Sequence, residues 1–355
     1  MEQSQMARRK DDHLKLALAQ QGEKASDFDQ LRFVHHSLAL LKAEDVTLVT
    51  EWAGKSHPFP FYINAMTGGS TKAKQYNQQL SILARETQLA LASGSVSAAL
   101  KDPATADTYR VMREVNPEGF ILANLGAHHG VENAKRAVDL LKADALQIHL
   151  NVPQEVVMPE GDRDFSMWLT NIEQIVRQLD RPVIVKEVGF GMSQQTMRQL
   201  INIGVRTLDV SGRGGTNFIQ IENERDSTYD YRTLYQYGQS TAESLLESLP
   251  IQAECELLAS GGIRQPVDIA KALALGARAV GVAGGILAMI HHQGVEQAIE
   301  QVRNWQVQLA QICLMLGAKS VPELQQTDIV LNGSLREWAQ DRQLPYQQLA
   351  QRRKV

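Results

Sequence analysis

Eight short apolar runs alternate with longer helical patterns from about residue 61 onward, and each run ends in small or polar residues. This alternation is typical of βα units joined into a parallel sheet. The runs are apolar throughout, as expected where helices cover one face of each strand and packed side chains cover the other. They span 61–66, 90–95, 119–125, 145–152, 183–188, 207–211, 256–260 and 279–283. Eight such units predict an α/β fold of the TIM type, a (β/α)8 barrel.

A doubly wound sheet would show the same alternation and stays an alternative at this point. The even spread of glycine-rich run ends favours the barrel. Residues 1–60 are predicted to form an N-terminal helical extension with a helix near 12–19, residues 61–300 the barrel, and residues 301–355 a C-terminal helical segment packed on it. A polar stretch at 222–240 is longer than most βα loops, so we expect a lid, a subunit contact or an exposed insertion there.

Composition excludes several classes of partner and site. The formal net charge of -4 gives no basic field for nucleic acid or an anionic membrane. Cys255 and Cys313 are too far apart for a zinc motif or a disulfide framework, which suits a reducing compartment. No run approaches the roughly 20 apolar residues of a membrane span, and the first residues lack a signal-peptide pattern. The expectation is a soluble cytoplasmic protein.

Paired glycines follow the last two predicted strands. Residues 260–264 read Ser-Gly-Gly-Ile-Arg and residues 283–285 read Ala-Gly-Gly. In a barrel these loops lie beside a helix N-terminus, where unpaired N–H groups bind phosphate. Glycine lets a phosphate approach the backbone, and Arg264 can add a charged fork. A further run at 211–216, Ser-Gly-Arg-Gly-Gly-Thr, adds hydroxyls and N–H donors, so we expect a phosphate site at this end.

With these segments the sequence resembles the type 2 isopentenyl-diphosphate isomerases, FMN-dependent flavoproteins with a TIM-barrel fold, nearly end to end. Several of the matching segments occur in FMN barrels generally, but the Arg-Lys-x-x-His start and the run Gln-Ile-His-Leu-Asn-x-x-Gln-Glu are particular to this family. The other segments that carry the resemblance are 64–69, 93–95, 123–126 and 186–189.

The resemblance implies a set of residues for FMN. Lys186 would place a cation beside the N1–O2 side of the ring, where reduced flavin is negatively charged. The ring would be lined by Ala65, Met66, Thr67, Ser95 and Asn124. The ribityl phosphate would be held by Ser211, Thr216, Gly262, Ile263, Arg264, Ala283 and Gly284.

The resemblance also implies how the substrate is held. The N-terminal extension would close over the site, with Arg9 and Lys10 supplying positive charge for a diphosphate. His149 and Asn151, one pleat apart, would donate to the diphosphate together with Ser95. Glu155 would bind Mg²⁺, which takes one or two carboxylates and substrate phosphate oxygens. Taken singly, these residues have plainer explanations, such as a solvated terminus for Arg9 and Lys10.

The implied reaction converts isopentenyl diphosphate to dimethylallyl diphosphate in isoprenoid biosynthesis, without net redox change. Reduced FMN would shuttle the proton, Gln154 would lie near the isoprenyl carbons, and His149 and Lys186 would complete the catalytic set. NADPH would serve only to reduce the flavin. Similar enzymes are tetramers or octamers, so a homo-oligomer is expected.

Three other functions would fit parts of this sequence. An FMN-dependent 2-hydroxyacid oxidase needs a histidine base in the loop after the sixth or seventh strand, where 211–216 has none. A dehydrogenase of the inosine monophosphate type needs a nucleophilic cysteine on a barrel loop, and neither Cys255 nor Cys313 is placed for it. A non-catalytic flavin-binding barrel would have no use for Arg9, Lys10 or Glu155.

Overall fold

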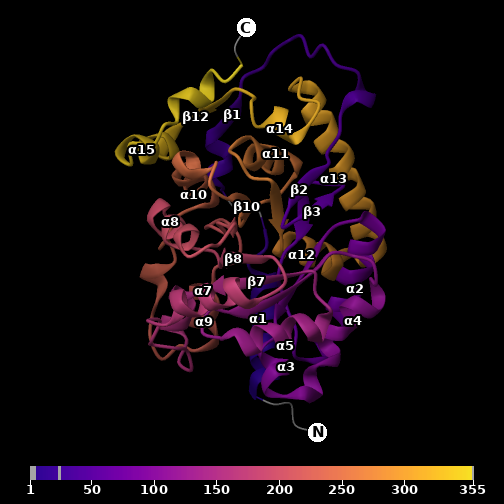
Figure 1. The fold of residues 1–355 in the computed structure, drawn as a ribbon, viewed down its shortest axis with the longest axis vertical. Coiled ribbons are helices and arrows are strands. Elements are labelled where there is room, and N and C mark those ends of the chain that lie inside the picture. Colours follow the sequence, from indigo (N-terminus) through magenta and orange to yellow (C-terminus); the bar gives the residue numbers. More distant parts are fainter. Residues whose placement is uncertain (1–4, 23–24, 354–355) are drawn as a thin grey trace.

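The computed structural model describes residues 5–22 and 25–353, and its centre is a closed barrel of eight parallel strands (Figure 1). Each strand pairs with the next along the chain, and β11 pairs with β4 to close the ring. The TIM-barrel prediction is confirmed, and the doubly wound sheet is wrong. In chain order the strands are β4 (Phe61–Ile63), β5 (Leu91–Ser95), β6 (Ile121–Gly126), β7 (Ala145–Leu150), β8 (Val183–Glu187), β9 (Thr207–Asp209), β10 (Glu256–Ser260) and β11 (Ala279–Val282).

Several strands end earlier than predicted, because the chain leaves the sheet at the barrel mouth. β4 ends at Ile63, β7 at Leu150 and β9 at Asp209. The polar residues that follow, such as Asn64 and Ser211, therefore lie in loops at the carboxyl ends of the strands. In barrels of this kind that end carries the site.

Amphipathic helices surround the barrel and bury their apolar faces on it (Figure 1). Three of them, α2, α8 and α10, begin at a serine whose hydroxyl accepts from an N–H of the first turn, which offsets the missing intrahelical bonds there. The helices that follow the strands are α2 (Thr71–Thr87), α3 (Ser97–Lys101), α4 (Asp107–Val115), α5 (Val131–Leu141), α6 (Val152–Val157), α7 (Trp168–Gln178), α8 (Gln194–Asn202), α9 (Phe218–Arg225), α10 (Thr241–Ser248), α11 (Pro266–Ala274) and α12 (Gly284–Gln293).

The amino end of the barrel is closed by a short hairpin, β2 (Thr50–Trp52) and β3 (Lys55–His57). Trp52 stacks on His57 at a centroid distance of 4.2 Å and packs against Tyr62 of β4 at 5.2 Å. Since aromatic side chains fill this end, access to the interior is from the opposite end.

The two ends of the chain meet outside the barrel. β1 (Leu31–Phe33) pairs antiparallel with β12 (Ile329–Leu331), which lies between α14 (Val321–Leu324) and α15 (Gly333–Asp341). The long helix α13 (Val295–Met315) crosses residue 300, so the C-terminal segment proposed from the sequence begins inside a helix. Within the described residues, none of the helices combines the length and apolar character that crossing a membrane requires.

Helix α1 (Gln5–Ala19) includes the predicted helix near 12–19 and extends it toward the N-terminus. It lies beside α9, across the mouth of the barrel (Figure 1). Gln20, just after α1, exchanges two hydrogen bonds with the backbone of Asn217, 3.2 Å and 2.8 Å long. The extension is thereby attached to the loop that follows β9.

Candidate active site

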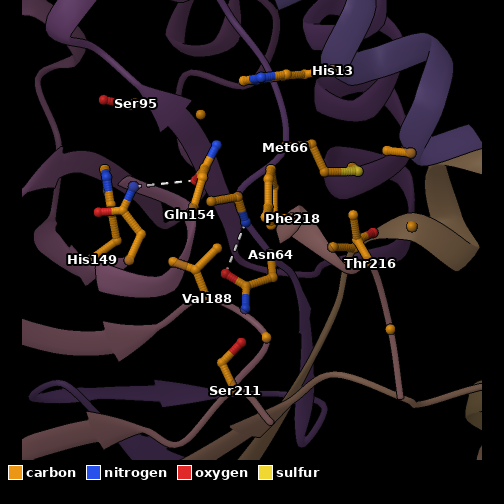
Figure 2. Close-up of a pocket in the computed structure, with 18 of the residues that line it drawn as sticks. His13, Asn64, Met66, Ser95, His149, Gln154, Val188, Ser211, Thr216 and Phe218 are labelled. Carbon is orange, nitrogen blue, oxygen red and sulfur yellow. Dashed lines mark hydrogen bonds between the residues drawn. The ribbon is translucent and has the colours of Figure 1, made fainter. Parts of the chain in front are cut away.

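One cavity of about 460 Å³ occupies the mouth of the barrel, at the carboxyl ends of the strands. Its volume is typical of sites for small molecules and cofactors. All of the site residues predicted from the sequence line it, from Arg9 and Lys10 of α1 to Ala283 and Gly284. Figure 2 shows His149, Ser95, Gln154, Met66 and Thr216 around this space. The fold therefore brings the predicted residues together around one cavity.

The glycine-rich end of the cavity is built from two loops in close contact. Gly261, Gly262 and Gly214 all have positive φ, at 92°, 74° and 118°. A Cβ added at Gly214 would lie 3.0 Å from the Cα of Gly262, so the loops after β9 and β10 could not approach as they do with side chains there. Nearby, α12 begins at Gly284 with no side-chain cap, which leaves its first N–H groups for a ligand. This arrangement fits a phosphate.

Arg264 does not supply a charged fork to this end in the way that the sequence suggested. Its guanidinium pairs with Asp29 at 2.6 Å and with Asp268 at 3.0 Å. Its backbone N–H also donates to Asp268, at 3.1 Å. Arg264 therefore fastens the N-terminal extension to the β10 loop, and the positive charge it would offer a phosphate is offset by two carboxylates.

The cavity also holds a polar group without a protein partner. The hydroxyl of Thr67, which lines the cavity, is buried and makes no hydrogen bond within the described residues. Unpaired buried hydroxyls are costly, so their presence points to a missing ligand. Gly94 has no side chain here because a Cβ would lie 2.6 Å from the backbone of Thr67. These features fit a flat ring with a polar edge, such as FMN.

Lys186 projects from β8 toward the same region. Its ammonium donates to the carbonyl of Glu187 at 2.6 Å and to Ser211 Oγ at 3.0 Å. Desolvation lowers the pKa of Lys186, while the charges of Asp209 and Glu187 oppose that shift. A buried ammonium in this setting can respond to negative charge on a bound ring.

The opposite end of the cavity carries Arg9, Lys10 and Lys101, and we call it the cationic end. Glu155, Glu160 and Asp162 also line the cavity, and Arg9 pairs with Glu160 at 3.4 Å. Desolvation, followed by the charge of Arg9, lowers the pKa of Lys10 to about 8. Desolvation also holds the pKa of His149 well below its usual value, so the ring is neutral near pH 7. An anion with several charges would complement this end.

Asn151 is placed differently from the prediction. Because β7 ends at Leu150, Asn151 does not share a strand face with His149 but precedes α6. Its amide nitrogen donates to Gln154 Oε1 at 3.1 Å and to Glu155 Oε1 at 2.9 Å. The second oxygen of Glu155 accepts from the backbone of Asp162 at 2.9 Å. Asn151 thus orients the two neighbouring side chains, and its own orientation is fixed in return.

Glu222 is the main residue that sequence reasoning missed. Its side chain is fully buried on α9, where Oε1 accepts from Gln154 Nε2 at 2.8 Å and Oε2 pairs with Arg225. His13 Nε2 lies 2.9 Å from Oε1, although it makes no well-aligned hydrogen bond to it. Burial alone would raise the pKa of Glu222, but His13, Gln154 and Arg225 outweigh burial and lower it to about 2. Glu222 is therefore ionised near neutral pH, and it lies directly behind Gln154, which lines the cavity.

Four further residues that the sequence did not single out also line the cavity. His129 Nε2 lies 2.8 Å from Ser97 Oγ, which lies 2.9 Å from Ser95 Oγ. His128 and Phe218 complete this set. The only indication in the sequence was that His128 and His129 come just after 123–126, one of the segments that carry the family resemblance.

The barrel with its glycine-lined end agrees with a known class: residues 124–331 match the family model described as FMN-dependent dehydrogenase, so this is an FMN-binding (β/α)8 enzyme. Solved structures show the same fold. A mandelate oxidase variant with 2-hydroxy-phenylacetamide aligns with a TM-score of 0.61 at 16% identity, over 91% of each chain. A flavocytochrome b2 variant with sulfite bound aligns with a TM-score of 0.63 at 20% identity, over 84% of this chain and 75% of that one.

Curated relatives are much more similar in sequence. A protein named isopentenyl-diphosphate delta-isomerase from Latilactobacillus sakei is 51% identical over 345 residues, 96% of this chain and 98% of that protein. The proteins of that name from Streptomyces sp. (strain CL190) and Staphylococcus epidermidis are 49% and 47% identical, over 98% and 97% of this chain and 95% and 99% of their own lengths. This chain belongs to the isopentenyl-diphosphate delta-isomerase family, and it is an isomerase.

Proposed function

We propose that this isomerase interconverts isopentenyl diphosphate and dimethylallyl diphosphate in isoprenoid biosynthesis, with reduced FMN and Mg²⁺ bound at the barrel mouth. The observation that carries the proposal is that a single cavity has two separate ends suited to anions. One is the glycine-lined end at Gly262 and Gly284, and the other is the cationic end at Arg9 and Lys10. A flavin phosphate and a substrate diphosphate need two such ends, and an apolar isoprenyl group would lie between them.

Bound and reduced, FMN would supply an electron-rich ring that can exchange a proton and stabilise positive charge. Thr67, Ser95 and Asn124 would contact the ring, and Lys186 would balance its charge. Gly262, Ile263, Ala283, Gly284, Ser211 and Thr216 would hold the phosphate, with Arg264 acting through the loop that it fastens. NADPH is proposed only as the reductant.

The remaining residues would hold and orient the substrate. Arg9 and Lys10 would neutralise the diphosphate, and α1 would shield it from water. His149 and Ser95 would donate to diphosphate oxygens. Gln154, fixed between Asn151 and Glu222, would present its amide to the isoprenyl carbons and position or relay the proton.

The test is an anaerobic assay with photoreduced FMN and isopentenyl diphosphate, without nicotinamide. Sustained formation of dimethylallyl diphosphate is the expected result, because the reaction needs no net electrons. Turnover that occurred only with NADPH added in stoichiometric amounts would rule the proposal out. Oxidation of lactate or glycolate in a parallel assay would favour the 2-hydroxyacid oxidase function instead.

The affinity for the diphosphate substrate is expected to fall more steeply once the pH rises above about 8, the pKa of Lys10 before substrate binds. Lys10 is protonated below that pH and adds no decline there, whereas above it the loss of its proton can add up to about tenfold per pH unit to the fall in affinity. The measurement is Kd for isopentenyl diphosphate against pH. Lys10→Arg keeps its proton throughout this range, so it should remove the part of the decline that begins near pH 8. An identical decline in Lys10→Arg would contradict the role of Lys10.

Glu155→Gln is expected to raise the Mg²⁺ concentration for half-maximal activity by at least about tenfold, as loss of metal-site groups commonly does. No three His, Cys, Asp or Glu side chains of the described residues converge as a metal cage, so Mg²⁺ would rely on Glu155 and phosphate oxygens. Glu160→Gln is the control, because Glu160 lines the same cavity but pairs with Arg225 and Arg9. A Mg²⁺ titration that is unchanged in Glu155→Gln would remove this assignment.

A further inference from the structure

A chain of buried side-chain amides crosses the barrel from β9 to β7. Asn64 Nδ2 donates to Asp209 Oδ2 at 2.9 Å, and Gln147 Nε2 donates to Asn64 Oδ1 at 3.2 Å. Asn124 Nδ2 donates to Gln147 Oε1 at 2.8 Å, and Asn124 Oδ1 lies 2.8 Å from His149 Nδ1. The members of this chain other than His149 are each 3% exposed or less, and they are Asp209, Asn64, Gln147 and Asn124. We call this chain the amide relay.

The direction of the amide relay is fixed by the backbone. The N–H of Ala65 lies 2.8 Å from the side chain of Asn64 and can only donate, so the atom facing it is the oxygen of Asn64. Gln147 must then present its nitrogen to Asn64 and its oxygen to Asn124. Asn124 in turn must present its nitrogen to Gln147 and its oxygen to His149.

The carboxylate of Asp209 supports the same direction from the far end. It accepts from Tyr62 Oη at 2.8 Å, from Ser260 Oγ at 2.8 Å and from the backbone of Ser211 at 3.1 Å, in addition to Asn64. Because its oxygens serve as acceptors for all of these donors, the amide of Asn64 has no reason to reverse.

The last step of the relay concerns the imidazole of His149. An oxygen faces Nδ1, so Nδ1 carries the proton, and in the neutral ring Nε2 is an unprotonated acceptor. Nε2 has no hydrogen-bond partner among the described residues and is not sealed from the cavity. The charged and titratable groups that face the ring are Lys10 of α1, Lys186 of β8, and His128 and His129 after β6.

We propose that Gln147 and Asn64 are positioning residues that hold His149 in the Nδ1-protonated form, so that Nε2 can bind a diphosphate oxygen only after taking up a proton. Diphosphate oxygens at neutral pH accept hydrogen bonds, and two acceptors repel. Binding therefore draws one proton from water onto Nε2, with no bond of the ligand broken, and the imidazolium then donates to the diphosphate. This inference rests on the proposed function, because it takes a diphosphate as the ligand at the cationic end.

Gln147 is the residue through which the relay can be tested. It is fully buried and does not line the cavity, so its replacement acts on His149 only through Asn124. Gln147→Met removes both links and frees the amide of Asn124 to turn over. Gln147→Glu is the matched variant, because a carboxyl oxygen can still accept from Asn124 and preserve the direction.

The first measurement is the 15N spectrum of the histidine side chains in FMN-loaded protein, with the His149 signals assigned through His149→Gln. Protonated and unprotonated ring nitrogens have well-separated shifts. The expected result is a proton on Nδ1 in the wild type and in Gln147→Glu, and a mixture of both forms in Gln147→Met. A wild-type ring with its proton on Nε2 overturns the proposal without any variant, so it stays testable if Gln147→Met does not fold.

The second measurement is proton uptake when inorganic pyrophosphate and Mg²⁺ bind to the FMN-loaded protein at pH 7. It is obtained by calorimetry in buffers with different ionisation enthalpies. Uptake should fall by up to about one proton per site in Gln147→Met and stay at the wild-type value in Gln147→Glu. Unchanged uptake in Gln147→Met would overturn the proposal. Neither measurement needs turnover, so failure of the isomerase assay and failure of the relay are separate results.

Discussion

Glu222→Gln is expected to lower kcat about 100-fold, within the range for loss of an acid–base function, while FMN and substrate still bind. Glu222 is a buried anion that fixes the amide of Gln154 and lies beside His13, and both of those side chains line the cavity. A glutamine at 222 could present its own nitrogen to Gln154 and turn that amide over. Steady-state assays with saturating Mg²⁺ should therefore show the loss in kcat and a KM within a few-fold of the wild type.

Removing any buried, paired carboxylate can destabilise a protein, so the Glu222 variant needs a matched control. Glu247 is also fully buried, pairs with Arg342 at 2.6 Å and lies away from the cavity. Glu247→Gln should lower the free energy of unfolding to a similar degree and leave kcat per folded molecule unchanged. Equal loss of kcat in both variants would mean that Glu222 only stabilises the fold.

The barrel could be predicted because its signal is local. Each strand is buried on both faces, so its sequence is a continuous apolar run. Each run ends where the chain leaves the sheet at the mouth of the barrel. Many of the predicted cavity residues lie in or directly after those runs, but their roles came from the resemblance to the isomerase family. Ala65, for example, lies two residues beyond the end of β4, whereas Arg9 and Lys10 lie on α1 and came from the resemblance alone.

The residues that the sequence did not reveal depend on contacts between distant segments. Glu222 acquires its role from His13 and Gln154, which are far from it along the chain. One local signal existed: Ile219, three residues earlier on α9, is also buried, so Glu222 occupies the buried face of that helix. Treating 222–240 as one polar insertion was therefore wrong at its start.

Whereas the role of Glu222 was missed, Arg264 was assigned a role that its contacts do not support. Its place after a glycine pair indicated a free cation, but Asp29 of the N-terminal extension and Asp268 of α11 take up its guanidinium. Asp268 was visible in the sequence four residues later, whereas the contact with Asp29 depends on how the extension folds back. The position of Arg264 in the motif predicted where its side chain lies, but the carboxylates that pair with it determine whether it can bind a phosphate.

Gly261→Ala is expected to weaken FMN binding by about 100-fold or more, because a displacement near 1 Å at a binding loop can cost that much. Gly261 has a φ of 92°, and a Cβ there would overlap the carbonyl oxygen of Gly212 and lie 3.1 Å from Thr241 Oγ1. The loop after β10 would have to move away from the loop after β9, which would open the phosphate end between them. Fluorescence titration of the apoprotein with FMN measures the affinity.

Backbone strain and loop displacement can be separated with Gly54, which has a φ of 71° and nothing within 4 Å of an added Cβ. Gly54→Ala carries only the strain of a left-handed alanine, roughly 1 kcal/mol or somewhat more. It should lower the free energy of unfolding by that amount and leave FMN affinity as in the wild type. Gly261→Ala should lose both stability and FMN. If Gly261→Ala bound FMN as tightly as Gly54→Ala, the glycine-lined end would not be the phosphate site, and the flavin would have to bind elsewhere in the cavity.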